Sequence, residues 1–287
     1  MINVLVTAKD GQLGQCFQSL VSKHPNLRFI FKSSSELDIT NKSNIEDVFD
    51  AHSFDYCINC AAYTAVDKAE EAVELADKVN HLGAHNLAEA CKKFDTTLIH
   101  ISTDFVFDGQ SKVPYLETDT TSPLGVYGET KLKGEHAISK TLKQHYIIRT
   151  SWLYSEYGNN FLKTMLRLAN ERDEIGVVGD QIGSPTYAKD LAEVVLQIVE
   201  LRKTSYGIYH YSNEGEISWY DFAKEIFRIS NSDIKLNKIA TTDYPTPAER
   251  PKYSILNTEK ISTLLDFQNP NWKVSLTKAY INLESKN

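Results

Sequence analysis

The stretch that decides the fold is INVLVTAKDGQLGQCFQSL, residues 2–20. A short apolar run at residues 2–7 is followed by a turn that contains Gly11 and Gly14, and then by apolar residues at helical spacing. This order predicts a strand, a glycine-rich turn and a helix, an arrangement in which free N–H groups at the helix start can bind a pyrophosphate. Ala8 stands in the first position of a G-x-x-G-x-x-G pattern. An ordinary tight turn therefore remains the alternative.

The same alternation continues along the chain. Further apolar runs at residues 27–31, 55–61, 97–102 and 146–149 predict strands, separated by helices that include one long helix at 65–93. Nearly continuous apolar strands between helices are typical of a parallel sheet covered on both faces. The sequence therefore predicts an α/β fold with a Rossmann-type doubly wound parallel sheet.

The composition changes after Thr150, where aromatic and amide side chains become frequent. A strand at 208–211, a helix at 219–229 capped by Ser218, and two short final helices that begin at Thr258 and Ser275 are expected there. We expect a smaller C-terminal α+β lobe. The predicted division assigns 1–150 plus about 186–213 to the domain with the glycine-rich turn, and 151–185 plus 214–287 to the smaller lobe.

The bulk composition narrows the class of protein. The chain has 287 residues, 41% hydrophobic and 24% charged, with a net charge of −7. Lys and Arg are scattered among the acids, so no basic face for nucleic acid is expected. No apolar run approaches the roughly 18 residues of a membrane span, and the N-terminus does not resemble a signal peptide. These features favour a cytoplasmic protein without nucleic-acid or membrane partners.

Three side chains between residues 99 and 133 can act together chemically. Thr103 ends a predicted strand, and Tyr127 and Lys131 lie four residues apart in a predicted helix, on one face and one turn apart. A tyrosine has an ordinary pKa near ~10, and a neighbouring ammonium lowers it toward the range of general acid–base catalysis. Tyr-x-x-x-Lys also occurs by chance in many helices. Its weight here comes from Thr103 upstream and from the nucleotide-binding turn.

The residues after the second strand bear on the choice of cofactor. An acid at this point binds the ribose 2′-hydroxyl in NAD-selective proteins. Here Lys32 is followed by three serines, and the first acid is Glu36. A cation and hydroxyls suit a 2′-phosphate, so NADPH is the expected cofactor, with NADH as a usable second.

The cysteines do not predict a metal or redox site. Cys57 and Cys60 have CxxC spacing, but they lie in a predicted strand, where residues three apart point to opposite faces. No second pair at zinc spacing follows. We expect buried structural cysteines and no bound metal.

Nine sequence blocks together resemble the extended short-chain dehydrogenase/reductases, and within them the reductases of dTDP-linked ketosugars. The similarity extends over nearly the whole chain. The blocks are DGQLG (10–14), ELDIT (36–40), NCAAYTAVDKAE (59–70), HISTDFVFDG (100–109), SPLGVYGETKLKGE (122–135), RTSWLY (149–154), GNNF (158–161), GDQIGSPT (179–186) and YPTPAERPKYS (244–254).

The resemblance implies that 1–150 plus about 186–213 form an NAD(P)-binding domain, and that 151–185 plus 214–287 form a sugar-nucleotide-binding substrate lobe. It also implies a reaction and roles for the site residues. The expected reaction is NAD(P)H-dependent reduction of the 4-keto group of dTDP-4-dehydro-L-rhamnose to dTDP-L-rhamnose. Tyr127 is then the proton donor, Lys131 binds the cofactor ribose and lowers the tyrosine pKa, and Thr103 hydrogen-bonds the substrate. The expected cofactor-binding residues, counting the turn glycine, are Gly11, Gln12, Leu13, Gly14, Asp38, Ile39, Ala62, Tyr63, Thr64, Tyr127 and Lys131.

The expected substrate-binding residues are Thr103, Asp104, Trp152 and Arg250. Trp152 matches an aromatic residue that packs on the sugar, with a place in the core as the alternative reading. Arg250, in a proline-rich loop, is our candidate cation for the diphosphate of a dTDP-sugar, with an ordinary surface arginine as the alternative.

Two departures from the family pattern bear on cofactor and assembly. Ser33 stands where many relatives carry the ribose-binding acid, which leaves the cofactor choice open. Some members dimerise through a magnesium ion held by glutamates, but the matching positions here are Cys16 and Lys189. We therefore expect a monomer without a magnesium-bridged interface.

Two other functions remain open at this stage. One is a different dTDP-ketosugar reductase or a sugar-nucleotide epimerase on the same scaffold, which would share the catalytic residues. The other is a non-catalytic regulatory subunit like the β subunit of methionine adenosyltransferase, although Thr103, Tyr127 and Lys131 are all present here.

Overall fold

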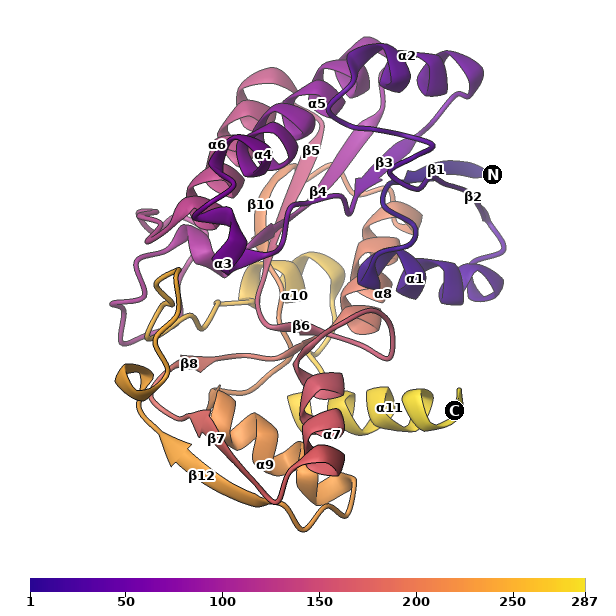
Figure 1. The fold of residues 1–287 in the computed structure, drawn as a ribbon. Helices are drawn as coiled ribbons and strands as arrows, with labels where there is room; N and C mark the ends of the chain where they lie inside the picture. The colour runs from indigo at the N-terminus through magenta and orange to yellow at the C-terminus, as the bar shows by residue number, and fades with distance from the viewer. Residues whose placement is uncertain (287) are drawn as a thin grey trace.

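A six-stranded parallel sheet forms the centre of the computed structural model, which describes residues 1–286 (Figure 1). Neighbouring strands run parallel, and the first strand lies inside the sheet with strands added on both sides. The predicted doubly wound Rossmann-type sheet is therefore confirmed. The strand order is β10 (Gly207–His210), β5 (His145–Thr150), β4 (Thr97–Thr103), β3 (Tyr56–Asn59), β1 (Ile2–Val6) and β2 (Leu27–Phe31).

Helices cover both faces of the sheet because its strands are apolar on both sides. Val4 and Val6 face a core shared with α1 (Gln12–Leu20) and α8 (Ala188–Glu200). Leu5 points to the opposite face, where the core is shared with three other helices. These are α2 (Lys42–Ala51), α5 (Ala84–Lys93) and α6 (Val126–Thr141).

The cysteines follow the same division between the two faces. Cys57 belongs to the core beneath α2 and α5, whereas Cys60 packs against the core on the α1 side. Both are free thiols. The two sulfurs therefore diverge as predicted, but β3 ends at Asn59, so Cys60 lies just beyond the strand and is only partly buried.

The single long helix predicted over residues 65–93 is wrong. The chain instead forms α3 (Val66–Ala69), α4 (Val73–Asp77), a π-helical turn η2 (Lys78–Gly83) and then α5. The wider turn accompanies close packing: a side chain at Gly134 of α6 would lie 2.2 Å from the Asn80 carbonyl oxygen. Tertiary contact, rather than helix propensity, decides the conformation here.

A smaller lobe follows β5 and has its own core. Tyr154, Leu162 and Phe222 belong to that core. Short parallel pairing of β7 with β12 and two-residue strand pairs accompany the helices. The elements are β6 (Leu153–Tyr154), α7 (Phe161–Glu171), β7 (Glu174–Val178), β8 (Ile182–Gly183), β9 (Thr186–Tyr187), β11 (Ile217–Ser218), α9 (Trp219–Ile229), β12 (Lys235–Ile239), α10 (Glu259–Leu265) and α11 (Trp272–Glu284), and the short 3₁₀ turns of the whole chain are η1 (Val21–Lys23), η3 (Asp104–Val106) and η4 (Thr241–Asp243).

The helix starts in this lobe were predicted with mixed success. Ser218 caps α9 through a reciprocal capping box with Asp221, as predicted. The last helix does not begin at Ser275. It begins at Trp272, because Asn271 accepts the Lys273 N–H, and the Ser275 hydroxyl inside the helix donates to Asp190.

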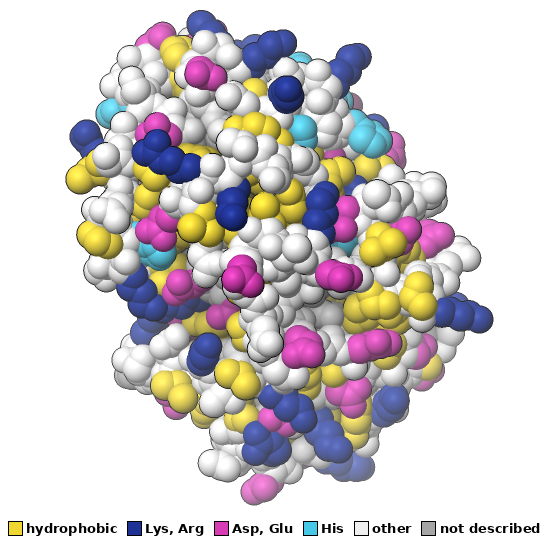
Figure 2. All heavy atoms as spheres, turned by 180° about the vertical axis from the view of Figure 1, so that it is seen from behind, with side chains coloured by type: hydrophobic (Ala, Val, Ile, Leu, Met, Phe, Trp, Pro, Cys, Tyr) yellow, Lys and Arg dark blue, Asp and Glu magenta, His cyan; other side chains and the backbone are white. Residues whose placement is uncertain are grey.

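The surface carries both signs of charge. Lys and Arg side chains alternate with Asp and Glu over the face seen in Figure 2. Among residues 1–286, no helix combines the length and apolar character that crossing a bilayer requires.

Candidate active site

The turn after β1 has the tight geometry that a bound phosphate requires. A Cβ at Gly14 would lie 2.4 Å from the Ala8 carbonyl oxygen, so only glycine fits there. The Gly11 N–H donates to the same oxygen at 3.0 Å. Ala8 itself has φ 52°, which lies in the left-handed region. The glycine that the G-x-x-G-x-x-G pattern has at this position would adopt this conformation without strain. The predicted turn forms, and α1 begins at its end with no side-chain cap on its first N–H groups, the kind of donors that can bind an anion.

The predicted residues of this turn divide by role. Leu13 is buried in the core below the sheet, so only its backbone can face a cofactor. The Gln12 side chain donates to the Leu153 carbonyl and accepts from Asn160 at 2.7 Å. Gln12 thereby ties the start of α1 to the smaller lobe.

After β2, the first acid, Glu36, is not free but forms an ion pair. Lys9 contacts Glu36 at 2.6 Å, and the Ser33 N–H donates to the same carboxylate. The Lys9 side chain and these hydrogen bonds lower the pKa of Glu36 to about 2. Beyond it, Asp38 is exposed and accepts from Thr40, while Ile39 is buried under α5.

The loop after β3 is fixed by a residue that the sequence reading missed. Asn80, in the π-helical turn, accepts the Tyr63 N–H at 2.8 Å and donates to the Tyr63 carbonyl and to Thr130. Because Thr130 lies in α6, this side chain links the predicted cofactor loop at Ala62, Tyr63 and Thr64 to the helix of Tyr127 and Lys131.

The structure brings the catalytic candidates to one edge of the sheet. Thr103 ends β4, and its hydroxyl donates to Asp104 at 3.1 Å and accepts the Phe105 N–H. The Tyr127 ring packs edge-on against Phe105, with ring centroids 5.5 Å apart. Lys131 is 1% exposed, and its Nζ lies 2.7 Å from the Ile101 carbonyl oxygen.

The proton affinities differ from the sequence expectation. Burial raises the pKa of Tyr127 to about 12, with the Thr103 hydroxyl acting in the opposite direction. Burial lowers the pKa of Lys131 to about 8 and raises the pKa of Asp104 to about 6. Burial, and not Lys131, dominates the pKa of Tyr127, because the Lys131 amine contacts Ile101 and His100 in this arrangement. Tyr127 therefore holds its proton at neutral pH, the state that a proton donor needs.

A cleft of about 770 Å³ opens beside these residues, between the sheet edge and the smaller lobe. Three of the four predicted substrate-binding residues line it: Asp104, Trp152 and Arg250. Trp152 adopts φ 47° and stacks on Trp219, with ring centroids 3.6 Å apart. An apolar wall that includes two stacked indoles suits a flat base or a sugar face.

The predicted phosphate-binding cation is already paired. Arg250 makes a bidentate contact with Asp67, at 2.5 and 2.6 Å, and both residues line the cleft. The Arg250 guanidinium lowers the pKa of Asp67. Two further arginines of the lining, Arg167 and Arg172, come from α7 and its C-terminal end.

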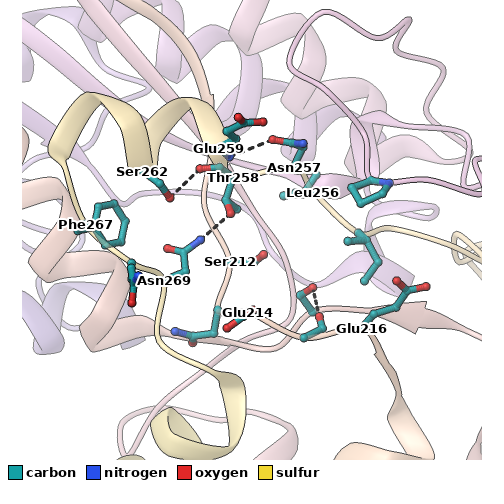
Figure 3. A pocket seen from close by; sticks show the side chains of 16 residues that line it. Ser212, Glu214, Glu216, Leu256, Asn257, Thr258, Glu259, Ser262, Phe267 and Asn269 are labelled. Carbon is teal, nitrogen blue, oxygen red and sulfur yellow. Dashed lines mark hydrogen bonds between the residues drawn. The ribbon is translucent and has the colours of Figure 1, made fainter.

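A second cavity, of about 760 Å³, lies between the loop after β10 and the segment around α10 (Figure 3). Ser212, Asn257 and Asn269 line it, together with three glutamates. Within residues 1–286 its lining includes no lysine and no arginine, whereas three arginines line the first cleft. Over the same residues, neither lining includes Thr103, Tyr127 or Lys131, but the first cleft includes Asp104 and Phe105, which follow Thr103 directly. It is therefore a poor place for a diphosphate, and the cleft beside Tyr127 is the candidate active site.

His100 and Asn59 are further polar residues that the sequence reading missed. His100 is 1% exposed, and its Nε2 lies 3.0 Å from Lys131 Nζ. Its position in IHIST offered a signal: strand alternation places it on the same face as Leu98, toward α6.

Comparisons with known proteins agree with this geometry. The family model for the RmlD substrate binding domain matches residues 2–285. A dTDP-4-dehydrorhamnose reductase from Aggregatibacter actinomycetemcomitans is 43% identical over 286 residues, covering 96% of this chain and 97% of the relative.

Two solved structures are similar over the whole fold. A dTDP-4-dehydrorhamnose reductase from Clostridium acetobutylicum has a TM-score of 0.94 and 42% identity, covering 99% of this chain and 100% of that one. A Bacillus anthracis reductase of the same name, solved in complex with NADP, has a TM-score of 0.95 and 39% identity, covering 98% and 100%.

Proposed function

The chain belongs to the RmlD substrate binding domain family of dTDP-4-dehydrorhamnose reductases, and from this premise we propose its reaction. It catalyses the NADPH-dependent reduction of the 4-keto group of dTDP-4-dehydro-L-rhamnose to dTDP-L-rhamnose, the last step in the synthesis of that sugar nucleotide. The observation that carries the proposal is the meeting of Thr103, the Tyr127 helix and the phosphate-binding turn at one edge of the sheet.

The residues present fit a dinucleotide cofactor. A Cβ at Gly14 would strike the backbone of Ala8 and Lys9, so glycine allows the tight turn that leads into α1, and the start of α1 supplies N–H donors for a pyrophosphate. Gly11, Gln12 and Ala62 are proposed to line the same site. When bound, the nicotinamide supplies the hydride.

We propose NADPH as the preferred cofactor, with NADH usable. Lys32 and the serines after β2 favour a 2′-phosphate, and Glu36 is neutralised by Lys9 rather than free to bind a ribose hydroxyl. The proposed contact of Asp38 and Ile39 with the cofactor rests on their match to the family motif. The proposed division into a cofactor domain and a substrate lobe is supported by β10, which returns to the central sheet.

The protein's own groups handle the proton. Negative charge develops on the ketone oxygen during reduction, and Tyr127 donates its phenolic proton there. The Thr103 hydroxyl, which donates to Asp104 in this structure, turns to donate its hydrogen bond to the same oxygen. An ammonium at Lys131 stabilises the phenolate that remains. Trp152 packs on the sugar, while Asp104 and Arg250 contact the substrate from the cleft wall.

The proposed assembly is a monomer without a bridging magnesium. Cys16 is fully buried, and burial raises its pKa to about 12, so it remains a thiol and not a metal ligand. Lys189 is a cation. Light scattering in magnesium and in EDTA should give the same monomer mass. A cytoplasmic location is part of the proposal.

The decisive assay follows loss of the reduced nicotinamide absorbance with dTDP-4-dehydrorhamnose, using NADPH and then NADH. Tyr127→Phe should reduce turnover by about 10²-fold or more and leave the NADPH dissociation constant within a few-fold of wild type. Activity within a few-fold of wild type in that variant would contradict the proton-donor role. Inertness toward this substrate with turnover of another ketosugar nucleotide would favour a different reductase or an epimerase. Co-purification with a larger enzyme, without NADPH oxidation, would favour a regulatory subunit.

A further inference from the structure

A buried chain of polar groups runs from Lys131 across the carboxyl ends of β4, β3 and β1. Lys131 Nζ lies 3.0 Å from His100 Nε2, and His100 Nδ1 lies 3.0 Å from Asn59 Nδ2. The Thr7 hydroxyl then donates to Asn59 Oδ1 at 2.8 Å. All four residues are at most 1% exposed. In such a place each hydrogen bond needs a donor on one side and an acceptor on the other.

The backbone fixes the orientation of the Asn59 amide. The Ala61 N–H, which can only donate, points to Asn59 Oδ1 at 3.1 Å. Thr7 Oγ1 accepts the N–H groups of Cys60 and Ala61, which directs its own hydrogen to the same Oδ1. Asn59 Oδ1 is therefore the accepting end, and its Nδ2 must donate to His100.

This orientation determines which ring nitrogen of His100 carries the proton. Burial and the nearby Lys131 hold the pKa of His100 well below its usual range, so the ring is neutral and has one N–H. Since Nδ1 accepts from Asn59, the hydrogen is on Nε2 and points at Lys131. An ammonium has three donors and no acceptor. The contact is satisfied only when Lys131 is a neutral amine that accepts from His100 and donates to Ile101.

We propose that His100, oriented by Asn59, is a positioning residue that controls the charge of Lys131. The present arrangement favours the neutral amine. The ammonium form requires the His100 proton on Nδ1 and a reversed Asn59 amide, at the expense of the contacts with Thr7 and Ala61. The inference rests on the proposed function in one respect: the ammonium is the form of Lys131 that assists Tyr127. The hydrogen-bonded row from Lys131 to Thr7 therefore sets the upper pH limit of the reaction.

Other groups that face Lys131 also influence whether it is an ammonium or a neutral amine. Glu135, one turn further along α6, favours the ammonium, but it is itself paired with Arg149 and accepts from Ser102. The Cys60 thiol has its pKa raised by burial and is neutral, as is Tyr127 at working pH. Burial of Lys131 opposes the ammonium and is the largest influence on its pKa.

The main test replaces the donor that faces Lys131. In His100→Gln, the side-chain oxygen has two acceptor positions, so it can accept from the Asn59 amide and from a Lys131 ammonium together. The pKa of Lys131, followed by NMR of lysine labelled at Cε and assigned with Lys131→Arg, should rise by roughly one unit. The alkaline limb of kcat/KM should move up by the same amount. His210→Gln is the matched control, because His210 is equally buried but contacts Arg149 instead. It should leave both values unchanged.

Two outcomes would overturn the proposal: a Lys131 pKa that stays or falls in His100→Gln, or an equal rise in the His210 control. If His100→Gln does not fold, nitrogen NMR of the wild-type imidazole decides the question, since a proton found on Nδ1 contradicts the inference. The NMR measurements need no substrate. Failure of the proposed reaction is thereby distinguishable from failure of this inference.

Discussion

Replacing Glu135 by Gln should cost the protein a large part of its stability. The Glu135 carboxylate and the Arg149 guanidinium have side chains 1% and 3% exposed, and they meet at 2.7 Å. Arg149 Nε also donates to both carboxylate oxygens, and the Ser102 hydroxyl donates to one. Glutamine keeps the volume but leaves the arginine charge buried without a counter-ion. Breaking such a pair costs about 3–5 kcal/mol, against a total of about 5–15 kcal/mol for a typical domain.

Urea unfolding followed by circular dichroism measures this loss. Glu171→Gln is the matched control: it breaks the exposed pair with Arg167 and should cost less than about 1 kcal/mol. Replacing both partners, Glu135→Leu with Arg149→Met, should recover most of the loss, since a buried ion pair exchanged for apolar groups is often neutral. A cost below about 1 kcal/mol for Glu135→Gln, equal to the surface control, would refute the reasoning.

Three further outcomes are expected. Gly14→Ala should weaken NADPH binding far more than Gly11→Ala in a fluorescence titration, because the added methyl meets the Ala8 carbonyl at 2.4 Å rather than 3.2 Å. Equal affinities of the two variants would contradict a cofactor-binding role for this turn. Ala8→Gly should stabilise the fold by up to about 1 kcal/mol by relieving a left-handed alanine, as thermal unfolding can check. Burial raises the pKa of Asp104 from 3.8 to about 6, so wild-type stability should fall as pH rises through that window, and Asp104→Asn should remove that fall.

The sheet could be predicted because its strands are apolar with few interruptions. Runs such as residues 2–7 and 146–149 leave few alternatives, and the capping box at Ser218 is a local signal that needs no tertiary partner. Local pattern also explains the errors. The π-helical turn at Lys78–Gly83 depends on contacts with α6, and β7 and β12 are short strands that pair across 61 residues of sequence.

The sequence motifs predicted where several of the candidate site residues lie. Thr103 and the helix carrying Tyr127 and Lys131 do meet at one sheet edge, and Trp152 lines the cleft. The pairing of Arg250 with Asp67 joins residues 183 positions apart, and no local pattern reports it. The direction of the Lys131 amine depends on His100, and hydrogen-bond geometry of this kind appears only when the strands are assembled.

The late return of the chain to the sheet has a consequence for how the protein is made. After β5 the chain enters the smaller lobe, comes back through α8, and adds β10 at the edge beside β5. During synthesis on the ribosome, α1 therefore packs against β1 and β2 but lacks α8 until residue 200 has emerged. A fragment that ends before α8 would expose the apolar face of α1 that packs against it.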